Sequence, residues 1–145
     1  MLSEATITSF KASLRGGLIE AGDSSYDAVR MVYNAMIDRR PRLIARCADV
    51  ADVMAAVKFG REQKLLVAIR GGAHNAGGLG VCDDGLVIDL SPMNYVRVDP
   101  KKRTVLVGGG ALWRDVDHAT HAFGLAIPAG IISTTGVGVD RKSVV

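Results

Sequence analysis

LLVAIRGGAHNAGGLGVCDDGLVIDL, residues 65–90, places a glycine-rich loop between two apolar runs of strand length. The runs 65–69 and 86–90 are each long enough for a buried strand. A turn signal, Asp83-Asp84-Gly85, comes immediately before the second run. This order predicts a strand, a glycine loop and a second strand.

The loop is rich in glycine around a single histidine, His74. Glycine costs backbone entropy on folding, so a loop that keeps five glycines is expected to need positive φ angles or close backbone approach. Consecutive amide N–H groups in such a loop form a concavity that binds anions, and a phosphate is therefore the expected ligand. The alternative is a plain flexible connection, although hairpins rarely need so long a loop. The five glycines are Gly71, Gly72, Gly77, Gly78 and Gly80.

Two common nucleotide-binding loops do not fit this stretch. A P-loop requires a lysine after its last glycine, and none follows here. A Rossmann fingerprint opens a helix, whereas these glycines lead into a second predicted strand. The loop is expected to bind its ligand in another way.

The segment Arg70-Gly71-Gly72-Ala73-His74-Asn75, followed by Gly78 and by residues 86–91, resembles the flavin diphosphate loop of FAD-linked oxidases with a PCMH-type FAD-binding domain. The most similar branch is the berberine-bridge-enzyme-like oxidoreductases of the vanillyl-alcohol-oxidase superfamily. The resemblance implies FAD as cofactor, with this loop around its diphosphate. It also implies a covalent bond from His74 to the 8α-methyl group of the isoalloxazine ring.

A second loop near the end of the chain, Ala129-Gly130 through Gly138, extends the resemblance. By chemistry alone, its small hydroxyls and glycines suit either a flat ligand with phosphates or an ordinary exposed loop. Some relatives carry a cysteine for a second flavin bond, and Ile132 stands at that place. The resemblance therefore implies no cysteinyl link. It implies cofactor contacts from Gly130, Ser133, Thr134, Gly136 and Gly138.

Helical periodicity predicts two helices before the first strand. Ser3 is expected to cap a helix that buries Ile7, Phe10 and Leu14, and residues 18–23 are expected to be a short connection. A second helix is expected over residues 26–36. We therefore expect residues 1–37 to form a helical extension.

The remaining elements alternate between strand and helix. A strand is expected over 43–45, followed by a helix capped by Asp49 with Val50, Val53, Met54 and Val57 on its apolar face. Two strands over 95–98 and 104–107 precede a helix that carries Leu112, Val116, Ala119 and Phe123 inward and that Gly124 ends. Its glycine-rich entry is either a second anion site or, more commonly, only a tight entry to the helix. The expected class is α+β, a PCMH-type FAD-binding domain at residues 38–145.

The resemblance also predicts how much of that domain is present. It implies the first α/β subdomain and the beginning of the second, with the C-terminal part and the substrate domain absent. After the second loop the chain ends in Asp140-Arg141-Lys142-Ser143-Val144-Val145. We expect either a truncated fragment or a chain that a partner completes.

Composition argues against several other classes. The net charge of +3 comes from scattered residues and predicts no nucleic-acid partner. No apolar run is long enough for a membrane helix, and the N-terminus lacks the zones of a signal peptide. Cys47 and Cys82 have no metal spacing, which indicates a reducing cytoplasm. His118 and His121 are expected on a solvated helix face, and no metal site is predicted.

The expected function is therefore that of an FAD-linked oxidoreductase. It would accept hydride from a small organic substrate, bound in a full-length relative, with oxygen as acceptor; the chemistry belongs to the cofactor, and no catalytic residue is assigned in this chain. One alternative is a truncated, inactive flavin- or nucleotide-binding fragment. Another is a phosphate-binding module outside flavin chemistry.

Overall fold

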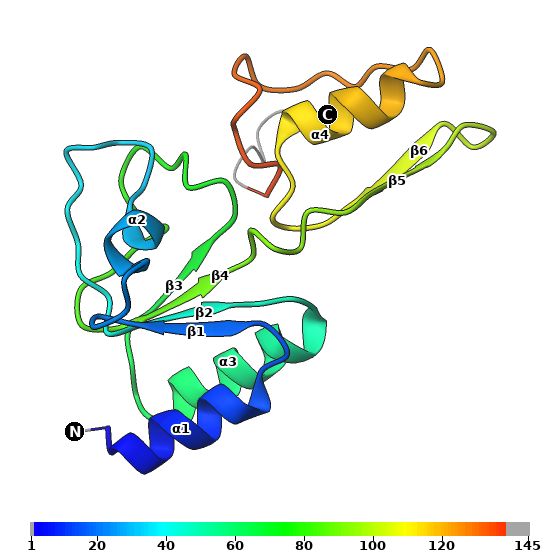
Figure 1. Cartoon of the computed structure of the whole chain (residues 1–145). Coiled ribbons are helices and arrows are strands. Elements are labelled where there is room, and N and C mark those ends of the chain that lie inside the picture. Colours follow the sequence, from blue (N-terminus) through cyan, green and yellow to red (C-terminus); the bar gives the residue numbers. More distant parts are fainter. Residues whose placement is uncertain (1, 139–145) are drawn as a thin grey trace.

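The computed structural model describes residues 2–138 and contains a four-stranded sheet and a separate two-stranded hairpin (Figure 1). The four-stranded sheet has the order β1-β2-β4-β3, in which β2, β4 and β3 are parallel and β1 is an antiparallel edge strand. The crossover helix α3 joins two of the parallel strands. The elements are β1 (Gly17–Glu20), β2 (Leu43–Arg46), α3 (Val50–Glu62), β3 (Val67–Arg70) and β4 (Leu86–Asp89).

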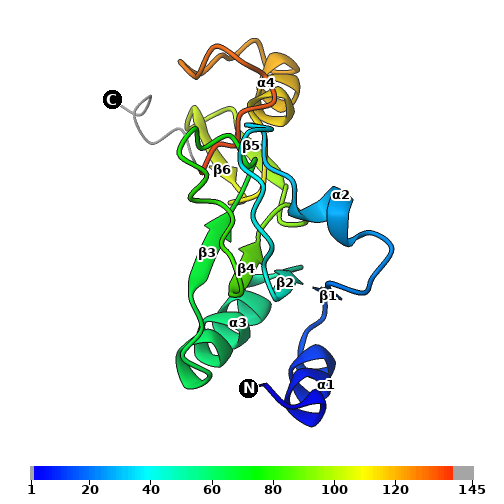
Figure 2. The same cartoon turned by 90° about the vertical axis from the view of Figure 1, so that its left-hand side faces the viewer.

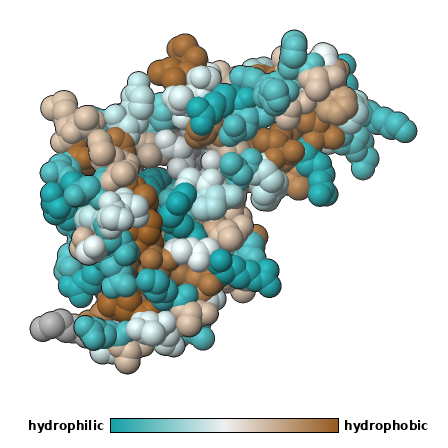
Figure 3. All heavy atoms as spheres, viewed as in Figure 1, coloured by the Kyte–Doolittle hydropathy of each residue, from teal (hydrophilic) through white to brown (hydrophobic). Residues whose placement is uncertain are grey.

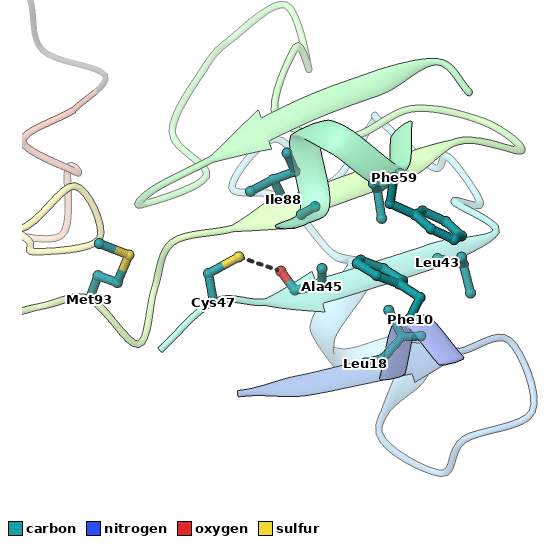
Figure 4. Packing of buried hydrophobic residues seen from close by; sticks show 10 residues of the cluster. Phe10, Leu18, Leu43, Ala45, Cys47, Phe59, Ile88 and Met93 are labelled. Carbon is teal, nitrogen blue, oxygen red and sulfur yellow. Dashed lines mark hydrogen bonds between the residues drawn. The ribbon is translucent and has the colours of Figure 1, made fainter. Parts of the chain in front are cut away.

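Figure 1 shows α1 (Glu4–Ser13) and α3 on one side of this sheet. The aromatic rings of Phe10 and Phe59 stack between the two helices, with centroids 3.9 Å apart (Figure 4). They pack with Leu43 and Ile88 from the central strands in one buried cluster. Burial of these apolar side chains fixes both helices on this face.

The other face of the sheet is covered by α2 (Tyr26–Arg30) and by the chain around it. Ile44 and Val87 point to this side and pack with Tyr26 and Val32. Neighbouring residues in a strand alternate between faces, so β2 and β4 are buried on both sides, as parallel strands usually are.

The hairpin of β5 (Val96–Asp99) and β6 (Thr104–Val107) lies with α4 (Trp113–His121) at the end of the molecule away from α1 (Figure 2). In the space-filling view the surface is indented between this part and the four-stranded sheet (Figure 3). Both strands and the positive φ of Gly124 after α4 agree with expectation. Trp113, Val116 and Thr120 form the buried face of α4, whereas Phe123 is exposed, contrary to prediction.

The predicted apolar face of α3 is only partly correct, because Val53 packs against the core but the other three residues do not. Val50, Met54 and Val57 are exposed, and the buried face instead contains Ala56 and Phe59. The reason is a buried carboxylate, Asp52, which accepts backbone hydrogen bonds from Arg15, Gly16 and Ala48 at 2.8–2.9 Å. These bonds turn the polar start of the helix inward. Asp49 caps the helix as expected.

Three other expectations differ from the structure. The segment 18–20, expected to be a connection, lies in β1, so the first 37 residues are not purely helical. α2 ends at Arg30 rather than Met36. β3 is an edge strand with Val67 and Ile69 exposed, so it is not fully buried. The domain boundary at residue 38 stays a prediction, and residues 140–145 lie outside the described part of the chain.

Cys47 and Cys82 are buried free thiols. Burial, together with the carboxylates of Asp52, Asp89 and Asp49, raises the pKa of Cys47 to about 12. Across residues 2–138 no helix has the length and apolar character to cross a bilayer. The same residues contain no group of three or more potential metal ligands from His, Cys, Asp and Glu.

Candidate functional site

The carboxyl ends of the three parallel strands form one edge of the site. Strand register places Arg46, Asp89 and Arg70 side by side as the last residues of β2, β4 and β3. In open α/β sheets, ligands bind outside this edge. The row of three charged side chains therefore marks the place where a ligand is expected.

Arg70 connects this edge to α2. Its guanidinium Nη2 donates to Asp89 Oδ2 at 3.0 Å, and Nη1 donates to the Val29 carbonyl at 2.6 Å. A longer bond of 3.5 Å reaches the Met31 carbonyl. Both carbonyls lie at the end of α2, and their bonds to Arg70 are consistent with the helix ending at Arg30. Arg70 lines the cavity described below, but its bonded donors serve protein acceptors, and a direct phosphate contact stays a prediction.

The loop after β3 has unbonded backbone donors. The amide N–H groups of five successive residues, Gly71 to Asn75, make no hydrogen bond to any part of the chain between residues 2 and 138. The next turn is closed by Gly78 N–H donating to the Asn75 carbonyl at 3.0 Å. A run of unbonded amides is what an anion-binding concavity requires.

The glycines of this loop allow close backbone packing. A Cβ atom built on Gly72 would lie 2.4 Å from the Gly136 nitrogen, and one built on Gly136 would lie 2.4 Å from the Gly72 nitrogen. Gly78 has φ +70. Ala73 also adopts a left-handed conformation, with φ 58, which is strained for a residue with a side chain. Part of the glycine pattern therefore serves the contact between two loops.

His74 is held by two distant segments. Its ring stacks on Tyr33 with centroids 4.0 Å apart and an interplanar angle of 20°. Its Nε2 lies 3.1 Å from the Thr134 hydroxyl. The Tyr33 amide also donates to the Ala73 carbonyl at 3.0 Å. The imidazole is therefore positioned by residues from before and after it in the chain.

A cavity of about 690 Å³ lies at this place. Its size is in the range of small-molecule and cofactor sites. It brings together the predicted residues Arg70, Gly71, Gly72, Ala73, His74 and Thr134. It is also lined by residues that were not predicted, Val29, Val32, Tyr33, Arg46, Asp89, Ser91, Asn94, Gly110, Leu112, Arg114 and Asp115.

The other predicted residues lie outside this cavity. Asn75 and Gly138 line a smaller neighbouring cavity of about 230 Å³. The Asn75 side chain accepts from the Leu79 amide at 3.1 Å, and Gly78 packs against Ile37. Gly136 supports the loop through Gly72. Gly130 and Ser133 lie in the irregular second loop, and their contact with a cofactor stays a prediction.

The start of α4 does not provide a second anion site. The Trp113 and Arg114 amides donate to the Thr135 and Ser133 carbonyls at 3.0 and 2.9 Å. The Asp115 amide donates to the Leu112 carbonyl at 3.0 Å. The second loop occupies the first donors of the helix, so its glycine-rich entry is structural.

Two unpredicted residues carry most of the site's additional chemistry. Arg46 and Asp89 could have been found from sequence. Arg46 follows the strand expected over 43–45, Asp89 lies near the end of the run 86–90, and strands joined by a helix are usually parallel. Tyr33 could not have been found, because it fell within the helix expected over residues 26–36, whereas the helix in the structure ends at Arg30. Its contact with His74 depends on that change of direction.

Comparison with known proteins supports a flavin site. A family model described as an FAD binding domain matches residues 41–139. The chain is 33% identical over 124 residues to (R)-6-hydroxynicotine oxidase of Paenarthrobacter nicotinovorans, covering 86% of this chain and 27% of that protein. It is 36% identical over 133 residues to an FAD-linked oxidoreductase of Dictyostelium discoideum, covering 91% and 29%.

A solved structure gives the same result. The wild-type BBE-like 1 protein of Physcomitrella patens matches with a TM-score of 0.84 and 27% identity, over 91% of this chain and 29% of that one. The chain thus spans little more than a quarter of the length of the relatives that it matches. The similarity includes the glycine loop and the residues up to the second loop.

Proposed function

Because this chain belongs to the family of FAD binding domains, we propose that its cavity holds FAD and that the chain forms the cofactor-binding part of an FAD-linked oxidoreductase. The expected resemblance to PCMH-type, berberine-bridge-enzyme-like oxidases and the α+β class are confirmed. The observation that carries the proposal is the run of amide N–H groups from Gly71 to Asn75, around the His74 ring, that have no hydrogen-bond partner within residues 2–138.

In this proposal the loop holds the diphosphate mainly through its backbone. Amide N–H groups in a glycine loop bind phosphate oxygens without a lysine. The charged row at the strand ends adds one net positive charge, because Arg46 and Arg70 share the single carboxylate of Asp89. Asp89 also lines the cavity, but its side chain is buried and ion-paired with both arginines.

His74 is proposed to anchor the isoalloxazine ring by a covalent bond. Bond formation would join an imidazole nitrogen of His74 to the methyl carbon of the ring, with loss of one N–H and one C–H bond. The two protons and the electron pair would pass to dioxygen and give hydrogen peroxide. With Ile132 at the place of the second linkage, a single bond is proposed.

The bound cofactor would accept a hydride from a small organic substrate and would deliver the electrons to oxygen. The chain's own contribution is to bind and to orient. Tyr33 and Thr134 hold His74, and the carboxyl edge of the sheet closes one wall of the cavity. Hydride transfer depends on that fixed geometry.

The proposal is tested by incubating the chain with FAD in air and then denaturing and filtering it. Yellow absorbance should stay with the protein. The mass of the protein should increase by the mass of FAD minus the hydrogens lost when the covalent bond forms. His74→Ala should release the colour on denaturation, whereas His118→Ala, at an exposed histidine of α4, should not. A colourless wild-type protein after incubation would contradict the proposal.

Turnover needs a separate measurement, because the chain spans little more than a quarter of its oxidase relatives. Oxygen uptake with candidate alcohols, sugars and cyclic amines would assign oxidase activity to this chain. Retained flavin without oxygen uptake would favour the alternative of a cofactor-binding fragment. Bound adenine nucleotide without flavin would instead favour a nucleotide-binding module.

A further inference from the structure

The His74 ring lies between two segments that are themselves fixed. On one side, Tyr33 stacks on the ring and is tied to the loop by the bond from its amide to Ala73. On the other side, Thr134 contacts Nε2. The two contacts come from residues 41 positions before and 60 positions after the histidine in the sequence.

Thr134 is held by the start of α4. Its neighbours Ser133 and Thr135 each accept a backbone hydrogen bond through their carbonyls, from Arg114 at 2.9 Å and from Trp113 at 3.0 Å. The segment therefore cannot move freely relative to α4. A side chain on so constrained a backbone is well suited to orient another group.

The contact leaves one ring nitrogen without a protein partner. Nε2 is 3.1 Å from the Thr134 hydroxyl, and Nδ1 has no hydrogen-bond partner among residues 2–138. If Nε2 carries the proton and donates to Thr134, then Nδ1 has a free electron pair. If Thr134 donates to Nε2, then Nδ1 carries the proton and is not nucleophilic.

We propose that Thr134 is a positioning residue that accepts the Nε2–H bond and thereby holds His74 in the tautomer whose Nδ1 is nucleophilic. This inference rests on the proposed flavin function and deepens it, since it assigns the orienting group for the covalent bond. An orienting partner on one ring nitrogen commonly decides the state of the other. Tyr33 adds the stacking contact that fixes the plane of the ring.

The test uses two readouts on the full chain. Nitrogen-detected NMR of the histidine rings, without cofactor, should show His74 protonated at Nε2 in the wild type. Thr134→Val removes the hydroxyl and keeps the shape, and it should give a mixture of tautomers. Covalent FAD incorporation should slow about tenfold in this variant, the equivalent of one hydrogen bond. Thr134→Ser, which keeps the hydroxyl, should restore both the tautomer and the rate of incorporation.

A wild-type ring protonated at Nδ1 would overturn the inference, as would wild-type incorporation by Thr134→Val. Should that variant fail to fold, Thr134→Ala takes its place, with Thr134→Ser again as the rescue. A wild-type chain that takes up no FAD would overturn the flavin function, and the ring spectra would still decide whether Thr134 sets the tautomer.

Discussion

Arg70 and Asp89 lie opposite each other in β3 and β4, with Nη2 and Oδ2 3.0 Å apart and both side chains almost fully buried. The same guanidinium bonds the Val29 carbonyl, and Asp89 Oδ1 accepts the Ser91 amide at 3.0 Å. One ion pair therefore joins the sheet, α2 and the chain leading to the hairpin. Both residues also line the proposed cofactor cavity, so this buried ion pair lies at the site itself.

Breaking this pair should destabilise the fold. Arg70→Met leaves the buried Asp89 carboxylate with the longer ion pair to Arg46 and the bond from the Ser91 amide, and the expected cost is about 3 kcal/mol, typical for a buried charge that loses its main partner. Urea denaturation measures it. Lys58→Met removes an exposed partner of Glu62 and should cost less than about 1 kcal/mol. Equal losses in the two variants would show that the buried pair has no special role.

A residue larger than glycine at the contact between the two loops should disturb the site without unfolding the sheet. Gly72→Ala places a methyl group 2.4 Å from the Gly136 nitrogen, on backbone that cannot rotate away. The loops must separate, so FAD binding is expected to weaken at least about tenfold, as when a binding geometry is displaced by an ångström. Equilibrium FAD titration measures this. Gly22→Ala, at an open position, is the control, and similar affinities would contradict the expectation.

The sequence predicts this site well where local chemistry decides the structure. The glycine loop, its flanking strands, the Asp49 cap and the hairpin depend on nearby residues, and they appear where expected. The predicted residues from Arg70 to His74 also line one cavity with Thr134. That these residues lie in one cavity was expected from the family resemblance, not from their spacing in the sequence.

The errors arise where distant contacts override periodicity. Val50 and Met54 fit an apolar helical stripe, yet α3 rotates because the Asp52 carboxylate binds amides of the chain before β1. α2 ends early where Arg70 takes carbonyls that another helical turn would use. No local pattern reveals an acceptor or donor supplied from residues 37 or 41 positions away.

Asp52 should make stability depend on pH in the acid range. Burial raises the pKa of this carboxyl, but hydrogen bonds from the Arg15, Ala48 and Gly16 amides lower it more. The pKa of Asp52 in the folded state therefore lies below its usual value of 3.8. Because the folded state has the lower pKa, the stabilisation is present above 3.8 and is lost as pH falls through the folded-state value.

Asp52→Asn tests this relation, because the amide side chain keeps the size but not the charge. We expect the variant to be less stable at neutral pH by about 1–3 kcal/mol, the cost of unsatisfied buried donors. The difference from wild type should shrink as pH falls below 3.8, measured by urea denaturation at several pH values. A difference that stays constant with pH would exclude the carboxylate as its source.

A substitution at Lys64 is expected to increase the stability of the fold, in contrast to those at Arg70 and Asp52. It follows the end of α3 with φ 54, its amide donates to the Arg61 carbonyl at 3.2 Å, and the Leu65 amide donates to the Gly60 carbonyl at 2.9 Å. This pair of bonds is the Schellman arrangement, in which glycine is the favoured residue. Lys64→Gly should therefore stabilise the fold by about 1 kcal/mol, since a left-handed conformation costs a residue with a side chain about that much. Thermal unfolding measures the change. Lys58→Gly, inside α3, should destabilise by about 1 kcal/mol instead, and a loss of stability in Lys64→Gly would show that the lysine side chain matters more than its backbone.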